Sequence, residues 1–236
     1  MVKNLRDTIN RRLKKLGWQG REVKIALSYL KGKERILDVG CGDGDFMQYF
    51  PPGRITGIDI DAKRIGVCCA KGLDALVMDA LSMDLDGQYD AVHCSHVIEH
   101  LYPSEFVRLL EQIDKKLVEG GILIIRTPLM WKGFYDTSAH IRPYPPCAVM
   151  YELPDYQIKK LVYSSAYRVG RIVHPCQPII ASCFMAFLMV CSYLGILFWK
   201  RDVYILILQK AAKRQKEIAI KRTLKKAKFR AKEGIR

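Results

Sequence analysis

The sequence lacks the features that mark secreted or repetitive proteins. Its eight cysteines are scattered, with no C-x-x-C pair and one adjacent pair, Cys68 and Cys69. No apolar run of signal-peptide length precedes the first expected strand, and there is neither an internal repeat nor a low-complexity linker. These absences argue against a disulfide framework and favour reduced thiols in a cytosolic compartment.

Acidic residues are scarce at both ends of the chain. Residues 1–24 hold eight Lys or Arg against two acidic residues, and residues 210–236 hold twelve against two. The net charge of +15 therefore leaves residues 25–209 nearly neutral. Apolar residues recur at helical spacing within both basic ends: Leu5, Ile9, Leu13, Leu16, Ile220, Leu224, Ala227 and Ala231. We expect two amphipathic helices that bind anionic lipid, with nucleic acid as the weaker alternative and solvated helix faces as the neutral one.

Short apolar, β-branched segments alternate with helical ones through the middle of the chain. The strand-like segments are RILDVG, RITGIDI, ALVMDA, YDAVHCS and GILIIRTP, and a helix is expected from about Pro103 to Glu119. Strands that are apolar on both faces and separated by helices predict a parallel sheet wound by crossover helices. The Pro- and Tyr-rich stretch 135–155 is expected to form a long loop over the sheet.

Glycines and aspartates stand at the ends of the first three strands. The segment ILDVGCGDG turns sharply at Gly40 and Gly42, and its G-x-G-x-G spacing departs from the dinucleotide fingerprint. Asp59 ends the second strand, where a carboxylate can accept both ribose hydroxyls. Asp61 is expected to cap the next helix. Asp79 follows the third strand and suits an adenine amine.

Five motifs in order then resemble the class I S-adenosylmethionine-dependent methyltransferases, especially the type 11 branch. They are LDVGCGDG, GIDID, DALSMDL, YDAVHCSHVIEHL and GGILIIRTP, across residues 35–128. The resemblance implies a doubly wound, seven-stranded, mostly parallel α/β sheet and S-adenosylmethionine as cofactor. It also implies a cofactor site around the methionine moiety, the ribose and the adenine. The predicted cofactor-binding residues are Asp38, Gly40, Cys41, Gly42, Asp59, Ile60, Asp79, Ala80 and Cys94.

The segment HVIEH, from His96 to His100, matches the H-x-x-E-H pattern of certain zinc proteases. That pattern needs a long helix, whereas a strand leads into this segment and Pro103 follows shortly after it. No metal site is therefore expected here. Because the fourth strand delivers these residues to the methyl group, His100 and His96 are the candidate general bases, and His93 is expected in the core.

The acceptor is expected to meet Glu99 and the loop after the fifth strand. AHIRPYPP in this loop offers His140, Arg142 and Tyr144, and an arginine suits an anionic acceptor. A structural role for His100, or a loop salt bridge for Arg142, is the alternative.

One long apolar run interrupts the C-terminal region. Residues 179–199 form 21 positions without Asp, Glu, Lys, Arg or His, which is long enough to cross a bilayer. The resemblance implies that the strands before and after it, about 167–174 and 203–208, are antiparallel neighbours. A full crossing would separate them, so we expect the run to dip into one leaflet; a buried helix or a dimer interface is the alternative.

Together these patterns predict a methyltransferase that acts at a membrane surface on an amphiphilic or lipid-linked acceptor. The expected organisation is a basic arm over 1–30, a methyltransferase domain over 31–210 with an apolar insert at 176–200, and a basic tail over 211–236. We expect association with the cytoplasmic face of a membrane. An RNA methyltransferase and a non-catalytic membrane adaptor are the alternatives.

Overall fold

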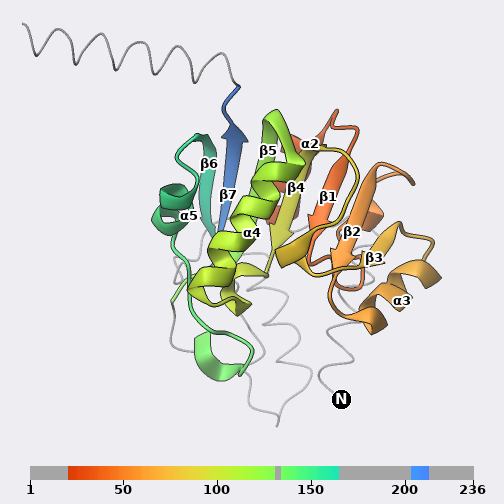
Figure 1. Ribbon diagram of the computed structural model, residues 1–236, viewed down its shortest axis with the longest axis horizontal. Helices are drawn as coiled ribbons and strands as arrows, with labels where there is room; N and C mark the ends of the chain where they lie inside the picture. The colour runs from red at the N-terminus through yellow and green to blue at the C-terminus, as the bar shows by residue number, and fades with distance from the viewer. Residues whose placement is uncertain (1–20, 131–133, 165–202, 213–236) are drawn as a thin grey trace, which may run out of the picture.

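The computed structural model describes residues 21–130, 134–164 and 203–212, which build a seven-stranded sheet with helices on both faces (Figure 1). Its order is β3-β2-β1-β4-β5-β7-β6, and β7 is antiparallel to both its neighbours. The predicted seven-stranded, mostly parallel sheet is thereby confirmed. The strands are β1 (Ile36–Val39), β2 (Ile55–Asp59), β3 (Ala75–Val77), β4 (Tyr89–Ser95), β5 (Leu117–Pro128), β6 (Tyr156–Ser164) and β7 (Val203–Lys210).

The connections between strands carry helices and short 3₁₀ turns. In Figure 1, α4 crosses the front of the sheet and α2 lies behind it. The helices are α2 (Arg21–Leu30), α3 (Ala62–Ala70), α4 (Pro103–Lys116) and α5 (Pro146–Glu152). The 3₁₀ turns are η1 (Met47–Tyr49), η2 (Ala80–Ser82), η3 (Ile98–His100) and η4 (Phe134–Asp136).

Alternate residues of the strands pack into two separate apolar cores, one on each face of the sheet. Leu37, Val92 and Leu123 belong to the core that includes apolar residues of α4. Ile36 and Ile124 belong to the opposite core, which includes apolar residues of α2 and α3. Because side chains alternate across a strand, a sheet covered on both faces needs apolar residues at nearly every strand position.

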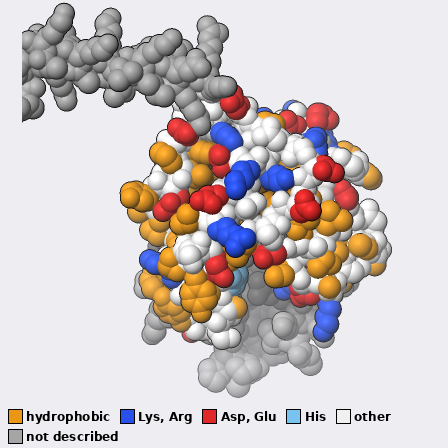
Figure 2. All heavy atoms as spheres, viewed as in Figure 1, with side chains coloured by type: hydrophobic (Ala, Val, Ile, Leu, Met, Phe, Trp, Pro, Cys, Tyr) orange, Lys and Arg blue, Asp and Glu red, His pale blue; other side chains and the backbone are white. Residues whose placement is uncertain are grey.

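Local capping explains why α4 begins where it does. Pro103 stands in its first turn, and Glu105 accepts a hydrogen bond from the backbone N–H of Tyr102 at 2.8 Å. The outer surface of the front layer carries interspersed acidic and basic side chains (Figure 2), in keeping with the nearly neutral middle of the chain.

Three expected boundaries change in the structure. Residues 21–30 of the predicted basic arm form α2, whose Ala26 and Leu30 are buried, so that part belongs to the folded domain. The strand paired with β7 is β6 at Tyr156–Ser164, earlier than the predicted 167–174, which lies outside the described residues. The predicted loop 135–155 contains α5, because Pro146 at the helix start and Val149 in the core favour a helical turn there.

The apolar run 179–199 and both basic ends before 21 and after 212 lie outside the described residues. Within the part of the chain that the structure does describe, no helix combines the length and apolarity that a bilayer crossing requires.

The carboxyl ends of the parallel strands lie together at one edge of the sheet. The parallel strands β1, β2, β4 and β5 all finish there. At that edge Val203, which begins β7, is the register partner of Pro128 at the end of β5 and of Ser164 at the end of β6. The chain therefore leaves β6 and returns into β7 at the edge that carries the glycine turn.

Candidate active site

The glycine turn follows β1 directly and is fixed by backbone hydrogen bonds. The N–H groups of Gly40 and Cys41 both donate to the carbonyl of Ile58, at 2.8 and 3.0 Å. Gly40 and Gly42 have φ of +68° and +56°, a conformation that side chains with a Cβ rarely adopt. The turn therefore needs glycine at these positions for its backbone. Gly40 is partly exposed, whereas Gly42 is buried.

Asp59, at the end of β2, ties the glycine turn to the second strand. One carboxylate oxygen accepts from Gly42 N–H at 2.9 Å, and the other accepts from Asp61 N–H at 2.9 Å. Asp61 in turn caps α3 by accepting from the N–H of Lys63 at 2.9 Å, which confirms its predicted role as a helix cap. Two backbone N–H groups thus orient the carboxylate of Asp59, which is the residue predicted to bind the ribose.

The other predicted cofactor-binding residues divide into exposed and buried groups. The side chain of Ile60 is 74% exposed, and the exposed Asp79 accepts from Leu81 N–H at 2.8 Å. Ala80 packs against the α4 core, and Cys94 is buried within it. Ile60 and Asp79 are therefore accessible to a ligand, whereas the Cys94 side chain points into the α4 core.

A cavity of about 270 Å³ opens between α2, the glycine turn and the ends of β4 and β5. On its wall, His93 Nδ1 donates to the carboxylate of Asp38 at 2.7 Å, and the Phe46 ring stacks on His93 at 3.8 Å. Asp38 and His93 are both buried, and His93 lies within the sheet as expected. The cavity is lined by Glu22, Val23, Ala26, Asp38, Gly40, Cys41, Asp45, Phe46, Tyr49, His93, Ser95, Arg126 and Ile205.

Arg126 on the cavity wall was not among the predicted site residues. Its guanidinium donates to Glu22 at 3.0 Å and to His96 Nε2. Its Nε is buried without a hydrogen-bond partner among the described residues. A single cation near the end of the otherwise apolar strand GILIIRTP was the available signal, because an unpaired charge there would be costly.

Glu99 is fully buried at the start of the acceptor side. Its two oxygens accept from His96 Nδ1 and from Thr127 Oγ1, both at 2.9 Å. Burial by itself would raise the pKa of Glu99, but the hydrogen bonds from His96 and Thr127 outweigh it and lower the pKa. A polar chain therefore runs from Arg126 through His96 to an ionised Glu99.

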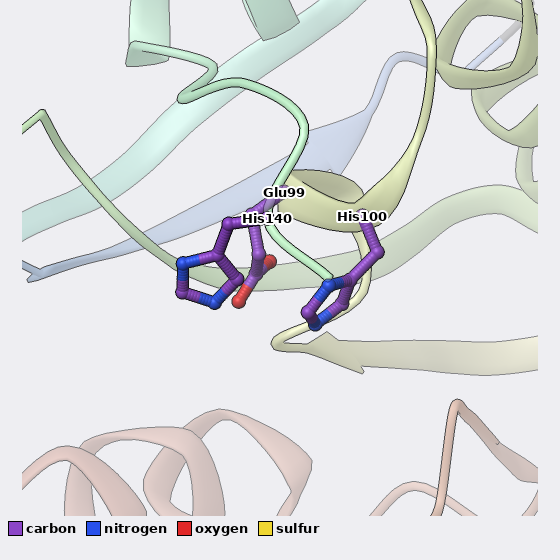
Figure 3. Close-up of side chains that lie close together, drawn as sticks. All are labelled: Glu99, His100 and His140. Atoms are coloured by element: carbon purple, nitrogen blue, oxygen red, sulfur yellow. The ribbon is translucent and has the colours of Figure 1, made fainter. Parts of the chain in front are cut away.

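The other two histidines of this region meet at Glu99 (Figure 3). His100 Nδ1 donates to the carbonyl of Ala139 at 2.7 Å, and His140 Nδ1 donates to the carbonyl of Phe134 at 2.6 Å. The ring centroids are 5.1 Å apart. In the neutral form of each ring, the lone pair is therefore on Nε2.

The HVIEH segment does not form the long helix of a zinc protease. Ile98–His100 is a single 3₁₀ turn, η3, and His96 has a φ of +59°. His96 has both ring nitrogens engaged, one by Glu99 and one by Arg126. The pairing of His96 with His100 that the protease pattern requires is therefore absent.

The remaining predicted acceptor residues differ in accessibility. Tyr144 is buried, stacks on Phe106 at 4.0 Å and donates to the carbonyl of Leu101 at 2.9 Å. The exposed Arg142 lies 5.3 Å from the centre of the Tyr144 ring. Tyr144 thus holds the loop against α4, and Arg142 offers the accessible charge.

Comparison with known proteins identifies a family and a fold that agree with this arrangement. The profile of the methyltransferase domain family matches residues 4–154. The chain belongs to the methyltransferase domain family. Its similarity to a solved S-adenosylmethionine-dependent methyltransferase of Archaeoglobus fulgidus extends over 87% of this chain and 94% of that one, with a TM-score of 0.58 and 22% identity. The predicted class I methyltransferase fold is therefore confirmed.

The similarity to curated relatives covers less of the chain. It is 30% identical to the probable methyltransferase ltbC of Aspergillus luteorubrus, over 50% of this chain and 47% of that protein. It is 31% identical to the ubiquinone biosynthesis O-methyltransferase of Bordetella bronchiseptica, over 48% of each. The matched region thus spans about half the length of these two relatives.

Proposed function

We propose that this chain is an S-adenosylmethionine-dependent methyltransferase that acts at a membrane surface on an amphiphilic acceptor. The observation that carries the enzymatic part is the hydrogen bond between Asp59 and the N–H of Gly42. It couples a glycine turn to a carboxylate at the neighbouring strand end, beside a cavity of about 270 Å³. This is the edge where open α/β sheets bind their ligands.

The residues at this edge fit the cofactor. Ligand cavities commonly have volumes of roughly 300 to 1,000 Å³, so the cavity here suits the methionine part of the molecule rather than the whole. Arg126 and Asp38 on its wall match a carboxylate and an ammonium group. The nucleoside then lies outside it, with its ribose on Asp59 and its adenine against Ile60 and near Asp79.

S-adenosylmethionine, when bound, supplies a methyl group attached to a positively charged sulfur. The chain's own residues must align the acceptor and, for a hydroxyl, accept its proton. His100 is the first candidate base, because its bond to Ala139 fixes the tautomer that has a lone pair on Nε2. His96 is the second, and it must release Arg126 to accept a proton at Nε2.

The membrane part of the proposal rests on sequence and strand register. Ser164 at the end of β6 is paired with Val203 at the start of β7, and paired strands lie about 4.8 Å apart. A segment between two such ends cannot cross a bilayer an odd number of times, because both ends must remain on one side. The apolar run 179–199 is therefore proposed to enter one leaflet and return, beside the edge that binds the cofactor.

Product analysis tests the enzymatic proposal. The full chain is incubated with methyl-labelled cofactor and, separately, with membrane lipid and RNA fractions. We expect S-adenosylhomocysteine and label in the organic phase of the lipid reaction. Label in RNA would favour the nucleic-acid alternative, and cofactor binding without product from either fraction would favour an adaptor.

Thiol accessibility tests the membrane proposal. Single cysteines at Ala181, Ala186 and Ile196, in a chain whose native cysteines are replaced, are exposed to a water-soluble thiol reagent in sealed vesicles. We expect protection of the apolar positions and no residue labelled from the far side alone. Labelling from the far side alone would demonstrate a span, and full reactivity at all three would exclude lipid contact.

A further inference from the structure

Three side chains that can ligate a metal ion converge on the acceptor side of the sheet. Glu99, His100 and His140 each offer a ligand atom, and these atoms lie within 4.8 Å of one another. Figure 3 shows the Glu99 carboxylate between the two imidazole rings. Two of the residues are neighbours in η3, whereas the third comes from the loop that follows η4.

Each of these side chains is held by a second contact that leaves lone pairs free. The Nδ1 atoms of His100 and His140 donate to backbone carbonyls, at 2.7 and 2.6 Å. Histidines that bind metals almost always donate their other ring N–H in this way, which fixes the ring and its tautomer. Each oxygen of Glu99 accepts one described side-chain hydrogen bond, and a carboxylate oxygen can accept two.

Two imidazole nitrogens and one carboxylate oxygen form a donor set of known preference. Such sets bind Zn²⁺ and related transition-metal ions, whereas Mg²⁺ and Ca²⁺ prefer oxygen donors. Bonds of about 2.0 to 2.2 Å to a tetrahedral ion require donor atoms roughly 3.4 Å apart. Closing the present spacing therefore requires movements of about 1 Å, within reach of side-chain rotation.

We infer that Glu99, His100 and His140 bind one divalent transition-metal ion, Zn²⁺ or an ion of similar preference. Three protein ligands leave a coordination position open, as in catalytic zinc sites. The second histidine is His140 rather than the His96 of the sequence pattern, and His96 instead orients Glu99 from behind. Binding of the ion does not depend on the proposed function.

The role of the ion does rest on the proposed methyltransferase function. Glu99 connects through His96 to Arg126 on the cavity wall, so the site adjoins the proposed cofactor pocket. An ion here would bind an acceptor oxygen and lower its pKa. The acceptor class this favours is a hydroxyl compound. With the ion bound, Nε2 of His100 is a metal ligand and not a free base, and the proton of the bound hydroxyl passes to water.

Direct binding measurements test the site. The full chain is stripped with a chelator and titrated with ZnCl₂ in a calorimeter, and Co²⁺ is followed by its visible absorption spectrum. We expect one ion per chain and a spectrum of nitrogen and oxygen ligands. His140→Asn and Glu99→Gln should each weaken binding about tenfold or more, whereas Glu111→Gln on the exposed face of α4 should not.

Two results would overturn the inference. One is wild-type affinity no greater than that of His140→Asn, and the other is a Co²⁺ spectrum with thiolate charge transfer, which would assign the ion to cysteines. His140 lies in a loop and is partly exposed, so its variant remains informative if the buried Glu99→Gln fails to fold. Cofactor binding is measured on the metal-free chain, so failure of the metal site and failure of the proposed function give different results.

Discussion

Replacing Asp59 with asparagine tests the cofactor site at its most constrained point. Both carboxylate oxygens already accept backbone N–H groups, from Gly42 and Asp61, and each retains a lone pair for a ribose hydroxyl. An asparagine amide keeps one acceptor and turns an NH₂ group toward a backbone donor. The variant therefore loses the negative charge and one of the two acceptors while its size is unchanged.

The expected loss of cofactor affinity follows from the hydrogen bonds. A hydrogen bond to a charged group is worth about 1.5 to 3 kcal/mol, which corresponds to roughly 10- to 100-fold in affinity. Calorimetric titration with S-adenosylmethionine and S-adenosylhomocysteine measures it. Thermal unfolding of the same variant separates loss of binding from loosening of the glycine turn.

The neighbouring carboxylate supplies the matched control. Asp61→Asn removes the same charge two residues away, and asparagine caps a helix about as well as aspartate. Its cofactor affinity should stay within about twofold of wild type. Equal affinities for Asp59→Asn and wild type would refute the assignment of Asp59 to the ribose.

Three further outcomes are expected. Gly44→Ala should destabilise the fold by about 1 to 3 kcal/mol more than Gly53→Ala in thermal unfolding. The two glycines have similar φ values, +75° and +77°. A Cβ at Gly44 would lie 2.3 Å from a carbon of Leu73, whereas a Cβ at Gly53 would have no atom of the described residues, apart from its chain neighbours, within 4 Å. Equal losses would contradict that packing. Arg126→Gln should lower cofactor affinity about tenfold by calorimetry, with exposed Arg108→Gln unchanged; unchanged binding would remove Arg126 from the pocket. Deleting 213–236, beyond the end of β7, should weaken flotation with anionic vesicles in a salt-dependent manner, and salt-insensitive binding to neutral vesicles would refute this electrostatic account.

The positions of the parallel strands and of the glycine turn along the chain could be predicted from the sequence because their signals are local. The apolar strands, the glycines after β1 and the aspartate at the end of β2 lie within a few residues of the structure they specify. Asp61 is the clearest case, since a cap acts on N–H groups two and three residues away. Such interactions are readable wherever the pattern occurs.

Strand β6 and helix α2 were harder to locate because their signals depend on distant partners. Residues 156–164 include two lysines and two tyrosines and form a strand by pairing with β7, about forty residues later. Residues 21–30 resemble a continuation of the basic arm until Ala26 and Leu30 are buried against the sheet. Burial of this kind is a property of the assembled core, and it overrides local charge.

The acceptor side shows most clearly what each level decides. The sequence by itself determined that histidines and a glutamate follow β4 and that another histidine lies in the loop after β5. Only the tertiary structure decided that His140 joins Glu99 and His100, that His96 turns to Arg126, and that Tyr144 is buried. The physical reason is that hydrogen bonds between residues about forty positions apart depend on how a loop packs over the sheet, and no spacing along the chain encodes that packing.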